Sequence, residues 1–126
     1  MNVLFLDDNP NRTKSFRSQV PYAKCVQTSQ QCIEQLERQK WDVVFLDHDL
    51  GDETYVDSSR EDCGMEVVRW VAQNYPKINE FVIHSHNGPA SQEMSLKLRD
   101  AGYHTTILPF AMFPQTNLYQ SLKVHT

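Results

Sequence analysis

The stretch Asp42-Val43-Val44-Phe45-Leu46-Asp47-His48-Asp49-Leu50-Gly51 decides the fold. Four apolar residues in a row, with no polar alternation, predict a strand that is buried on both faces, as in the middle of a parallel sheet. The run then changes abruptly to acidic residues and ends at a glycine. Because ligands of open parallel sheets bind outside the carboxyl ends of the strands, we expect Asp47, His48 and Asp49 to line a site.

The beginning of the chain repeats this design, because Asn2-Val3-Leu4-Phe5-Leu6 is followed by Asp7-Asp8-Asn9-Pro10. Two parallel strands that end in acids bring at least three carboxylates into one crevice, where they repel one another unless a cation lies between them. Hard divalent cations prefer carboxylate oxygens. We therefore predict a site for Mg²⁺ or Mn²⁺, with ligands drawn from Asp7, Asp8, Asp47 and Asp49.

Composition limits the class of protein. A chain of 126 residues with 40% hydrophobic residues has room for one domain (residues 1–126) with one hydrophobic core. Its formal net charge of −4 gives no general attraction to nucleic acid or to an anionic membrane, so neither is expected as a partner. No signal peptide or membrane-spanning run is visible. Three widely spaced cysteines favour a reducing cytoplasm over a disulfide framework or a zinc site.

Strand-like runs alternate with amphipathic segments along the chain. The predicted strands lie near residues 3–6, 24–27, 41–47, 81–83 and 105–108; the predicted helices cover about 11–19, a segment capped by Thr28, 64–74, and 91–100, which Ser91 caps and Gly102 ends. This order predicts a three-layer α/β fold, a five-stranded parallel sheet with helices on both faces. The acidic insertion 51–63 is either a lid or a passive surface loop, and the tail 110–126 contains a short helix around 118–124.

A second group of polar residues follows the fourth strand, in His84-Ser85-His86-Asn87-Gly88-Pro89-Ala90. On a strand His84 and His86 share a face, and paired histidines suit proton transfer or phosphate binding, whereas a lone histidine there is usually structural. Asn87 and Gly88 lead into a helix N-terminus whose free N–H groups suit an anion, although most such loops are ordinary turns.

These motifs resemble the receiver domain of response regulators, a family with the flavodoxin-like fold. The resemblance covers about residues 2–110 and rests on Leu6-Asp7-Asp8 (the acidic pair), Trp41 to Asp47 (the phosphoacceptor strand), Gly64-Met65-Glu66-Val67-Val68 (the start of the third helix), Ser85 (the hydroxyl position) and Pro109-Phe110. It implies that Asp47 occupies the phosphoacceptor position.

Departures from the receiver pattern point to a different activity. The lysine that contacts the phosphoryl group in receivers is Leu108 here, the fifth-strand aromatic is Thr105, and three histidines surround the crevice. The motifs Leu-Asp-Asp, Asp-His-Asp-Leu-Gly and His-Ser-His-Asn-Gly-Pro-Ala resemble a receiver-derived group called cyclic-phosphate-processing receiver domains. That resemblance implies a small phosphorylated, nucleotide-like substrate such as ADP-ribose 1″,2″-cyclic phosphate.

The sequence thus predicts a metal-dependent phosphohydrolase or phosphodiesterase that opens a cyclic phosphate. Its candidate catalytic residues are His84, His86, Asp47 and His48, and its candidate substrate-binding residues are Ser85, Asn87, Gly88 and Arg12. Either a water molecule or Asp47 can be the nucleophile.

Other classes of protein remain open. A degenerate receiver can bind a partner or ligand without turnover, because the missing lysine counts against switching but not against binding. Asp8 with Asp47-x-Asp49 superficially resembles nucleic-acid enzymes of the Toprim type, which the acidic balance and the receiver-like helix at Gly64 disfavour. The pair Asp47-x-Asp49 also resembles haloacid-dehalogenase phosphatases, but those carry it on their first strand.

Overall fold

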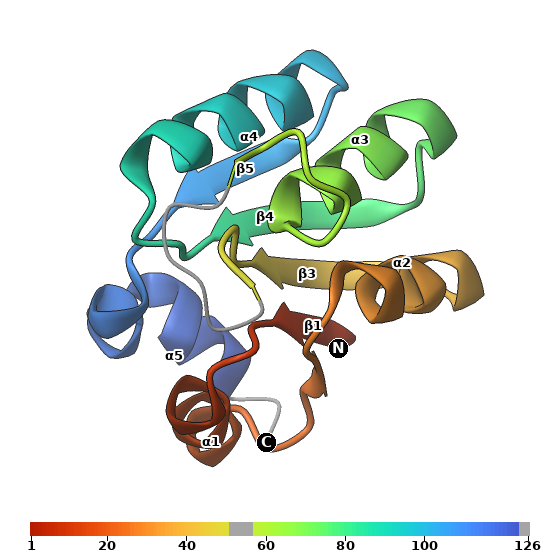
Figure 1. Ribbon diagram of the computed structural model, residues 1–126. Coiled ribbons are helices and arrows are strands. Elements are labelled where there is room, and N and C mark those ends of the chain that lie inside the picture. Colours follow the sequence, from red (N-terminus) through yellow and green to blue (C-terminus); the bar gives the residue numbers. More distant parts are fainter. Residues whose placement is uncertain (51–56, 124–126) are drawn as a thin grey trace.

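The computed structural model describes residues 1–50 and 57–123 (Figure 1). In chain order its elements are β1 (Val3–Leu6), α1 (Pro10–Gln19), β2 (Lys24–Val26), α2 (Ser29–Arg38), β3 (Trp41–Leu46), α3 (Gly64–Asn74), β4 (Ile78–Ile83), α4 (Gly88–Asp100), β5 (His104–Ile107), the 3-10 helix η1 (Phe110–Gln115) and α5 (Asn117–Lys123). The predicted alternation of strands and helices is confirmed, whereas η1 was not predicted. No helix in the described part of the chain is both long and apolar enough to span a membrane.

The described strands form one parallel sheet in the order β2-β1-β3-β4-β5. The strands β1 and β3 are neighbours inside this sheet, and all four residues of β1 are buried. Burial on both faces explains why their sequences show no polar alternation. Because all strands run in the same direction, their carboxyl ends share one edge of the sheet (Figure 1).

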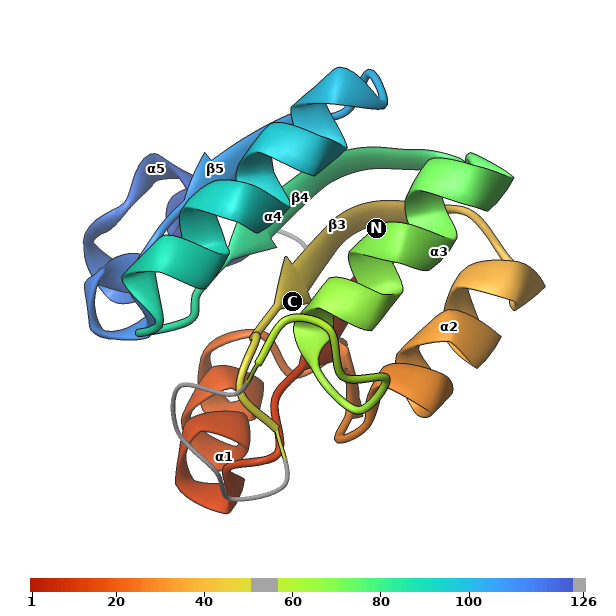
Figure 2. The ribbon, with the colours of Figure 1, turned by 45° about the horizontal axis from the view of Figure 1, so that its top comes forward.

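Helices cover both faces of the sheet, which confirms the predicted three layers and the flavodoxin-like fold. On one face, α2, α3 and α4 pack against strand residues such as Leu4 and Val44, and Figure 2 shows these three helices in front of the strands. On the other face, α1, η1 and α5 pack against Phe5 and Phe45. The ring of Phe16 in α1 stacks on Phe5, with the ring centroids 4.1 Å apart.

Gly64 brings the start of α3 against the loop that follows β3. Its backbone N–H donates to the carbonyl oxygen of His48 at 2.9 Å. A Cβ atom at position 64 would clash with the carbonyl oxygen of Asp47. Only glycine therefore allows this close approach, which fixes the loop that carries Asp47 and His48.

The helix α4 begins earlier than the sequence pattern predicts, at Gly88 and not at Ser91. The side chain of Asn87 caps this helix by accepting a hydrogen bond from the N–H of Ala90 at 3.2 Å. Asn87 thus satisfies the need for a cap four residues before the expected cap, Ser91, which lies buried within the helix. Gly102, with φ of 98°, follows the end of α4 as predicted.

The acidic insertion 51–63 is only partly visible, because residues 51–56 lie outside the described residues. In the remainder, Arg69 of α3 donates hydrogen bonds to the carbonyl oxygens of Ser58 and Arg60. The hydroxyl of Ser29 in α2 donates to the carbonyl oxygen of Glu61 at 2.8 Å. Residues 58–61 are therefore bound to α2 and α3. The segment 51–63, predicted as a lid or a passive loop, includes residues 51–56 outside the description, so the lid stays a prediction. The predicted tail helix is confirmed as α5, and residues 124–126 also lie outside the description.

Candidate functional site

The carboxyl ends of β1, β3 and β4 bring three polar side chains together. The strand register pairs Leu6 with Leu46 and Leu46 with Ile83, so the residues that follow, Asp7, Asp47 and His84, lie at the same level of the sheet. All three are buried, and a carboxylate oxygen or ring nitrogen of each lies within 4.8 Å of the others. Two carboxylates and an imidazole this close form a donor set that can hold a metal ion.

The Asp7 carboxylate accepts four hydrogen bonds. Its Oδ1 accepts from the backbone N–H of Asn9 at 2.9 Å and from Nη2 of Arg12 at 3.0 Å. Its Oδ2 accepts from Nε of Arg12 at 2.7 Å and from Nε2 of His84 at 3.0 Å. Burial alone would raise the pKa of Asp7, but the hydrogen bonds from His84 and Arg12 outweigh it and hold this pKa well below its usual range.

The Asp47 carboxylate has a different environment. Its Oδ1 accepts from the backbone N–H of His48 at 2.9 Å, and its Oδ2 lies 3.4 Å from Nη2 of Arg12. Burial raises the pKa of Asp47 to about 6. The negative charge of Asp7 adds to this rise, while the positive charges of His84 and Arg12 oppose it without outweighing the burial. Asp47 therefore accepts fewer hydrogen bonds than Asp7, which accepts four.

His84 is fixed by contacts on several sides. Its ring stacks on Phe5 with the centroids 4.7 Å apart and meets Phe110 edge-on at 6.1 Å. Because an ionised Asp7 can only accept a hydrogen bond, Nε2 of His84 must carry the proton that it shares with Asp7. The other ring nitrogen, Nδ1, is buried and has no hydrogen-bond partner among the described residues. His84 thus holds Asp7 in place from inside the protein.

A second hydrogen-bonded group surrounds His48. This fully buried side chain bonds through Nδ1 to Oδ1 of Asp49 at 2.8 Å and through Nε2 to the hydroxyl of Ser58 at 3.0 Å. The amide nitrogen of Asn87 donates to Oδ1 of Asp49 at 3.2 Å. Burial would lower the pKa of His48, but the nearby Cys63 thiol and the hydrogen bond to Asp49 outweigh it, so this pKa is raised.

The structure separates the predicted metal ligands into two sets. Asp7 and Asp47 belong to the group whose donor atoms converge. The Asp49 carboxylate instead bonds to His48 and Asn87, and Asp8 is partly exposed at the end of β1. Asp8 and Asp49 therefore remain predictions as ligands.

The residues after β4 differ from the strand-based expectation. The strand ends at Ile83, so the alternation that places His84 and His86 on one face does not continue: His84 is buried and His86 is exposed. The buried hydroxyl of Ser85 accepts a hydrogen bond from the N–H of Asn87 at 3.0 Å. Asn87 and Gly88 form the start of α4, where the Asn87 side chain already occupies one helix N–H.

Two contributions to this site could not be read from the sequence. Ser58 joins the His48 group from a loop that shows no periodicity, so nothing in the sequence placed it there. Arg12 was predicted to contact substrate because it follows the acidic pair. The structure adds that its guanidinium bonds to Asp7 and reaches Asp47, and that 29% of the side chain is exposed.

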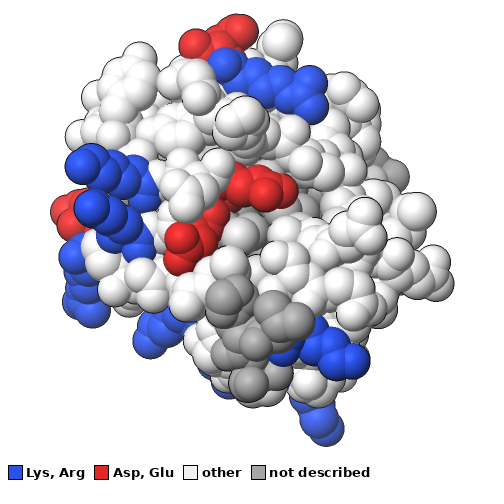
Figure 3. Space-filling model, turned by 180° about the vertical axis from the view of Figure 1, so that it is seen from behind, with Lys and Arg blue, Asp and Glu red and all other residues white. Residues whose placement is uncertain are grey.

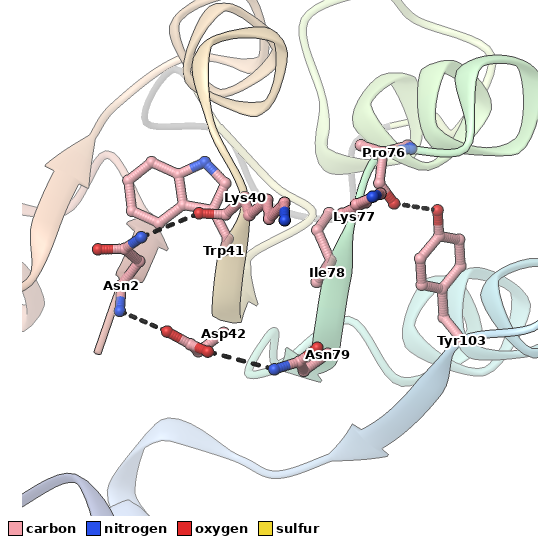
Figure 4. A pocket seen from close by; sticks show the side chains of 9 residues that line it. All are labelled: Asn2, Lys40, Trp41, Asp42, Pro76, Lys77, Ile78, Asn79 and Tyr103. Carbon is pink, nitrogen blue, oxygen red and sulfur yellow. Dashed lines mark hydrogen bonds between the residues drawn. The ribbon is translucent and has the colours of Figure 1, made fainter.

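A separate pocket of about 570 Å³ lies at the opposite edge of the sheet, at the amino ends of β3 and β4 (Figure 4). Several of its polar groups bond to one another. Asp42 accepts from the backbone N–H of Asn2 at 2.7 Å and from the side chain of Asn79 at 3.2 Å, and Tyr103 donates to the carbonyl oxygen of Pro76 at 2.6 Å. These bonds tie neighbouring strands together, and the site of converging carboxylates lies elsewhere.

Charged side chains are unevenly spread over the face seen from behind Figure 1. Figure 3 shows Lys and Arg side chains at separated places around the margin of this face and acidic side chains near its middle. The basic side chains visible there do not form one continuous patch.

Comparisons with known proteins concern the family of this chain and its fold. A family model described as "Cyclic-phosphate processing Receiver domain" matches residues 2–100. A sequence comparison with curated proteins gives no match.

Among solved structures, the chain is similar to a CheY-like response regulator receiver domain from Methylobacillus flagellatus, with 16% identity, a TM-score of 0.65, and coverage of 97% of this chain and 98% of that one. A second CheY-like receiver, from Methanospirillum hungatei JF-1, gives 13% identity, a TM-score of 0.61 and coverage of 99% and 98%. The third is a response regulator from Burkholderia pseudomallei, solved with a phosphorylated aspartic acid, a calcium ion and citrate. It gives 12% identity, a TM-score of 0.62, and coverage of 98% of this chain and 71% of that one. At these identities the likeness concerns the fold.

Proposed function

The chain belongs to the cyclic-phosphate-processing receiver domain family, and from this premise we propose that it is a metal-dependent phosphodiesterase. Its substrate is a small nucleotide-derived molecule with a cyclic phosphate, such as ADP-ribose 1″,2″-cyclic phosphate. The proposal is carried by the meeting of Asp7, Asp47 and His84 beside Arg12 at the carboxyl edge of the sheet. This arrangement joins a place for a divalent cation to a guanidinium that can bind phosphate.

The metal ion is Mg²⁺ or Mn²⁺, because the donors that converge are mainly carboxylate oxygens. Asp7 and Asp47 would hold it, with Asp8 and Asp49 as further candidates. When bound, the ion would neutralise phosphate charge and lower the pKa of a water molecule.

The other residues divide the remaining tasks. Arg12 binds a phosphate oxygen, and Ser85, Asn87 and Gly88 form the adjacent wall of the site. His86 is exposed next to this wall and transfers a proton to the leaving sugar oxygen or from the attacking water. His84 and His48 are each engaged by a carboxylate, so they position Asp7 and Asp49 in addition to their candidacy for proton transfer.

The second candidate function is binding without turnover. It is favoured by the histidines themselves, because Nε2 of His84 and both ring nitrogens of His48 are already engaged inside the protein. In that case His86 is a surface residue, and the site recognises a phosphorylated ligand without opening it.

The two functions are separated by following cyclic phosphates with phosphorus NMR in the presence of Mg²⁺ or Mn²⁺. We expect ADP-ribose 1″,2″-cyclic phosphate or a 2′,3′-cyclic nucleotide to be opened by the wild type. His86→Ala should lower turnover by about 10²–10⁴-fold, because it removes a proton-transfer group, while metal binding stays nearly unchanged. His104→Ala, at the exposed first residue of β5, is the matched control and should keep full activity.

One outcome would contradict the enzyme, and a second would contradict only the assignment of its histidines. Ligand binding that depends on metal, with no product after long incubation, would establish the binding module. Full activity in the His84→Ala, His86→Ala double variant would remove both residues from the chemistry and leave His48 as the remaining histidine candidate.

A further inference from the structure

The hydrogen bonds to Asp7 leave it no position for a metal ion. A carboxylate has about four lone-pair positions. All four are used here, by the N–H of Asn9, by Nη2 and Nε of Arg12, and by Nε2 of His84. An ion can therefore bind Asp7 only if one of these donors leaves.

The donors differ in their freedom to leave. The N–H of Asn9 belongs to the backbone of the residue that caps α1. His84 is buried and stacked on Phe5. Arg12 alone of the three donor residues reaches Asp7 through a long, rotatable side chain, and 29% of that side chain is exposed. Arg12 is thus the donor that can move out, and its departure opens two positions at once.

The charges around Asp47 favour the same exchange. The Arg12 guanidinium lies 2.7 Å from Asp7 and 3.4 Å from Asp47, so one positive charge forms ion pairs with two buried carboxylates. The contact to Asp47 is the weaker of the two, because a single guanidinium nitrogen makes it, whereas Asp7 receives two. A divalent ion between the same carboxylates brings twice the charge, and it leaves Arg12 facing solvent.

We propose that Arg12 occupies the metal position in the metal-free protein, and that a divalent cation enters by displacing the guanidinium from Asp7. The released guanidinium then becomes available to the substrate phosphate. This inference rests on the metal site of the proposed function but not on turnover. It makes Arg12 a competitor of the ion before it is a ligand of the substrate.

The affinity for Mn²⁺ tests this exchange directly, by electron paramagnetic resonance of free Mn²⁺ during titration of the protein. Arg12→Gln should bind Mn²⁺ at least about tenfold more tightly than the wild type, because the competing state is removed. Arg12→Lys keeps the charge without the two-pronged contact and should lie between them. Lys14→Gln removes the same charge from an exposed position of α1 and should stay within about twofold of the wild type.

The Arg12 Nε–H resonance provides a second measurement on the unmodified protein. Without metal, its bond to Asp7 should slow exchange with water and give a resolved signal in a ¹⁵N-correlated spectrum. Saturation with diamagnetic Mg²⁺ should move this signal to the position of a solvent-exposed arginine. A stabilising ligand that leaves Arg12 in place would not shift it.

The outcomes distinguish this inference from the proposed function. Equal Mn²⁺ affinity in the wild type and Arg12→Gln, with an unchanged Nε–H signal on saturation, would overturn the exchange and keep the metal site. Binding of neither Mn²⁺ nor Mg²⁺ by any of the variants would overturn both.

Discussion

Asp7 and Asp47 carry the same functional group on adjacent strands, and their surroundings move their pKa values in opposite directions. Asp7 accepts hydrogen bonds from the side chains of His84 and Arg12, which outweigh its burial and lower its pKa. Burial raises the pKa of Asp47 to about 6, and the charge of Asp7 adds a smaller contribution. At the level of single residues, the metal-free site therefore holds one carboxylate that stays ionised and one that takes up a proton below about pH 6.

The pH dependence of stability follows from this asymmetry. The pKa of Asp47 is about 6 in the folded protein and 3.8 when unperturbed, so the folded state binds more protons between these values. In EDTA, the free energy of unfolding should fall by on the order of 2–3 kcal/mol as the pH rises from about 4 to about 7. Asp47→Asn cannot titrate and should lose this contribution, which urea unfolding at several pH values would measure.

The comparison of the two proteins controls for other groups. Asp7, whose pKa is lowered, adds stability that is lost only as the pH falls below the usual range of a carboxyl group, in both proteins alike. His48, whose pKa is raised, loses its contribution at higher pH in both. Parallel stability curves for the wild type and Asp47→Asn would show that Asp47 is not protonated in this range.

The sequence predicted which residues reach the site better than it predicted their contacts. Asp7 and Asp47 could be found because each directly follows an apolar run that ends at the same edge of a parallel sheet. The bond between His84 and Asp7 joins residues 77 positions apart, so it depends on the strand register, which no local pattern contains. The exposure of His86 could not be anticipated because it depends on the strand ending at Ile83.

At the level of elements, uninterrupted patterns were read correctly and mixed ones were not. The amphipathic pattern of α3 gave its bounds, Gly64–Asn74, directly. The strand β4 begins at Ile78, before its predicted start near residue 81. The prediction began too late because Asn79 and Glu80 interrupt the apolar run that marks a buried strand. The 3-10 helix η1 contains Pro114 and lacks helical periodicity, so its sequence gave no sign of a helix.

The junction between β3 and α3 makes a prediction at this scale. Gly64→Ala places a Cβ against the backbone carbonyl of Asp47, so the loop or the helix must shift. We expect a loss of about 1–3 kcal/mol or more in the free energy of unfolding, from denaturant titration in EDTA. Gly88→Ala is the control, because no atom lies within 4 Å of the added Cβ and alanine favours a helix. Equal stability of both variants would mean that the close approach at Gly64 is easily relieved.

The molecule as a whole has the fold of a receiver, and Leu108 stands where the resemblance to receivers implies a lysine that contacts the phosphoryl group. Leu108 follows β5, donates its backbone N–H to Ile83 at 2.8 Å, and packs with the core on the α1 and α5 face. Acetyl phosphate should therefore produce no long-lived phospho-Asp47 and no dimer. Phosphate-affinity electrophoresis and light scattering after size exclusion would measure these.

Leu108→Lys is the variant to compare with the wild type in this experiment. Leu108 is half-buried, so a lysine there can keep its stem in the core and its ammonium group outside. This variant should retain phosphate on Asp47 longer than the wild type. A persistent phospho-Asp47 with dimerisation in the wild type would show that the chain acts as an ordinary signalling receiver.

The order of the strands also decides when the site can appear during protein synthesis. The strand β1 is made before the other strands of the sheet, yet it lies between β2 and β3. Asp7, directly after β1, is therefore made before the residues that contact it. A nascent chain that has left the ribosome as far as α3 contains both carboxylates but lacks His84. The complete group exists only after β4 has emerged and paired with β3. The hydrogen bond by which His84 holds Asp7 therefore forms late in synthesis, after the strands that carry both carboxylates have been made.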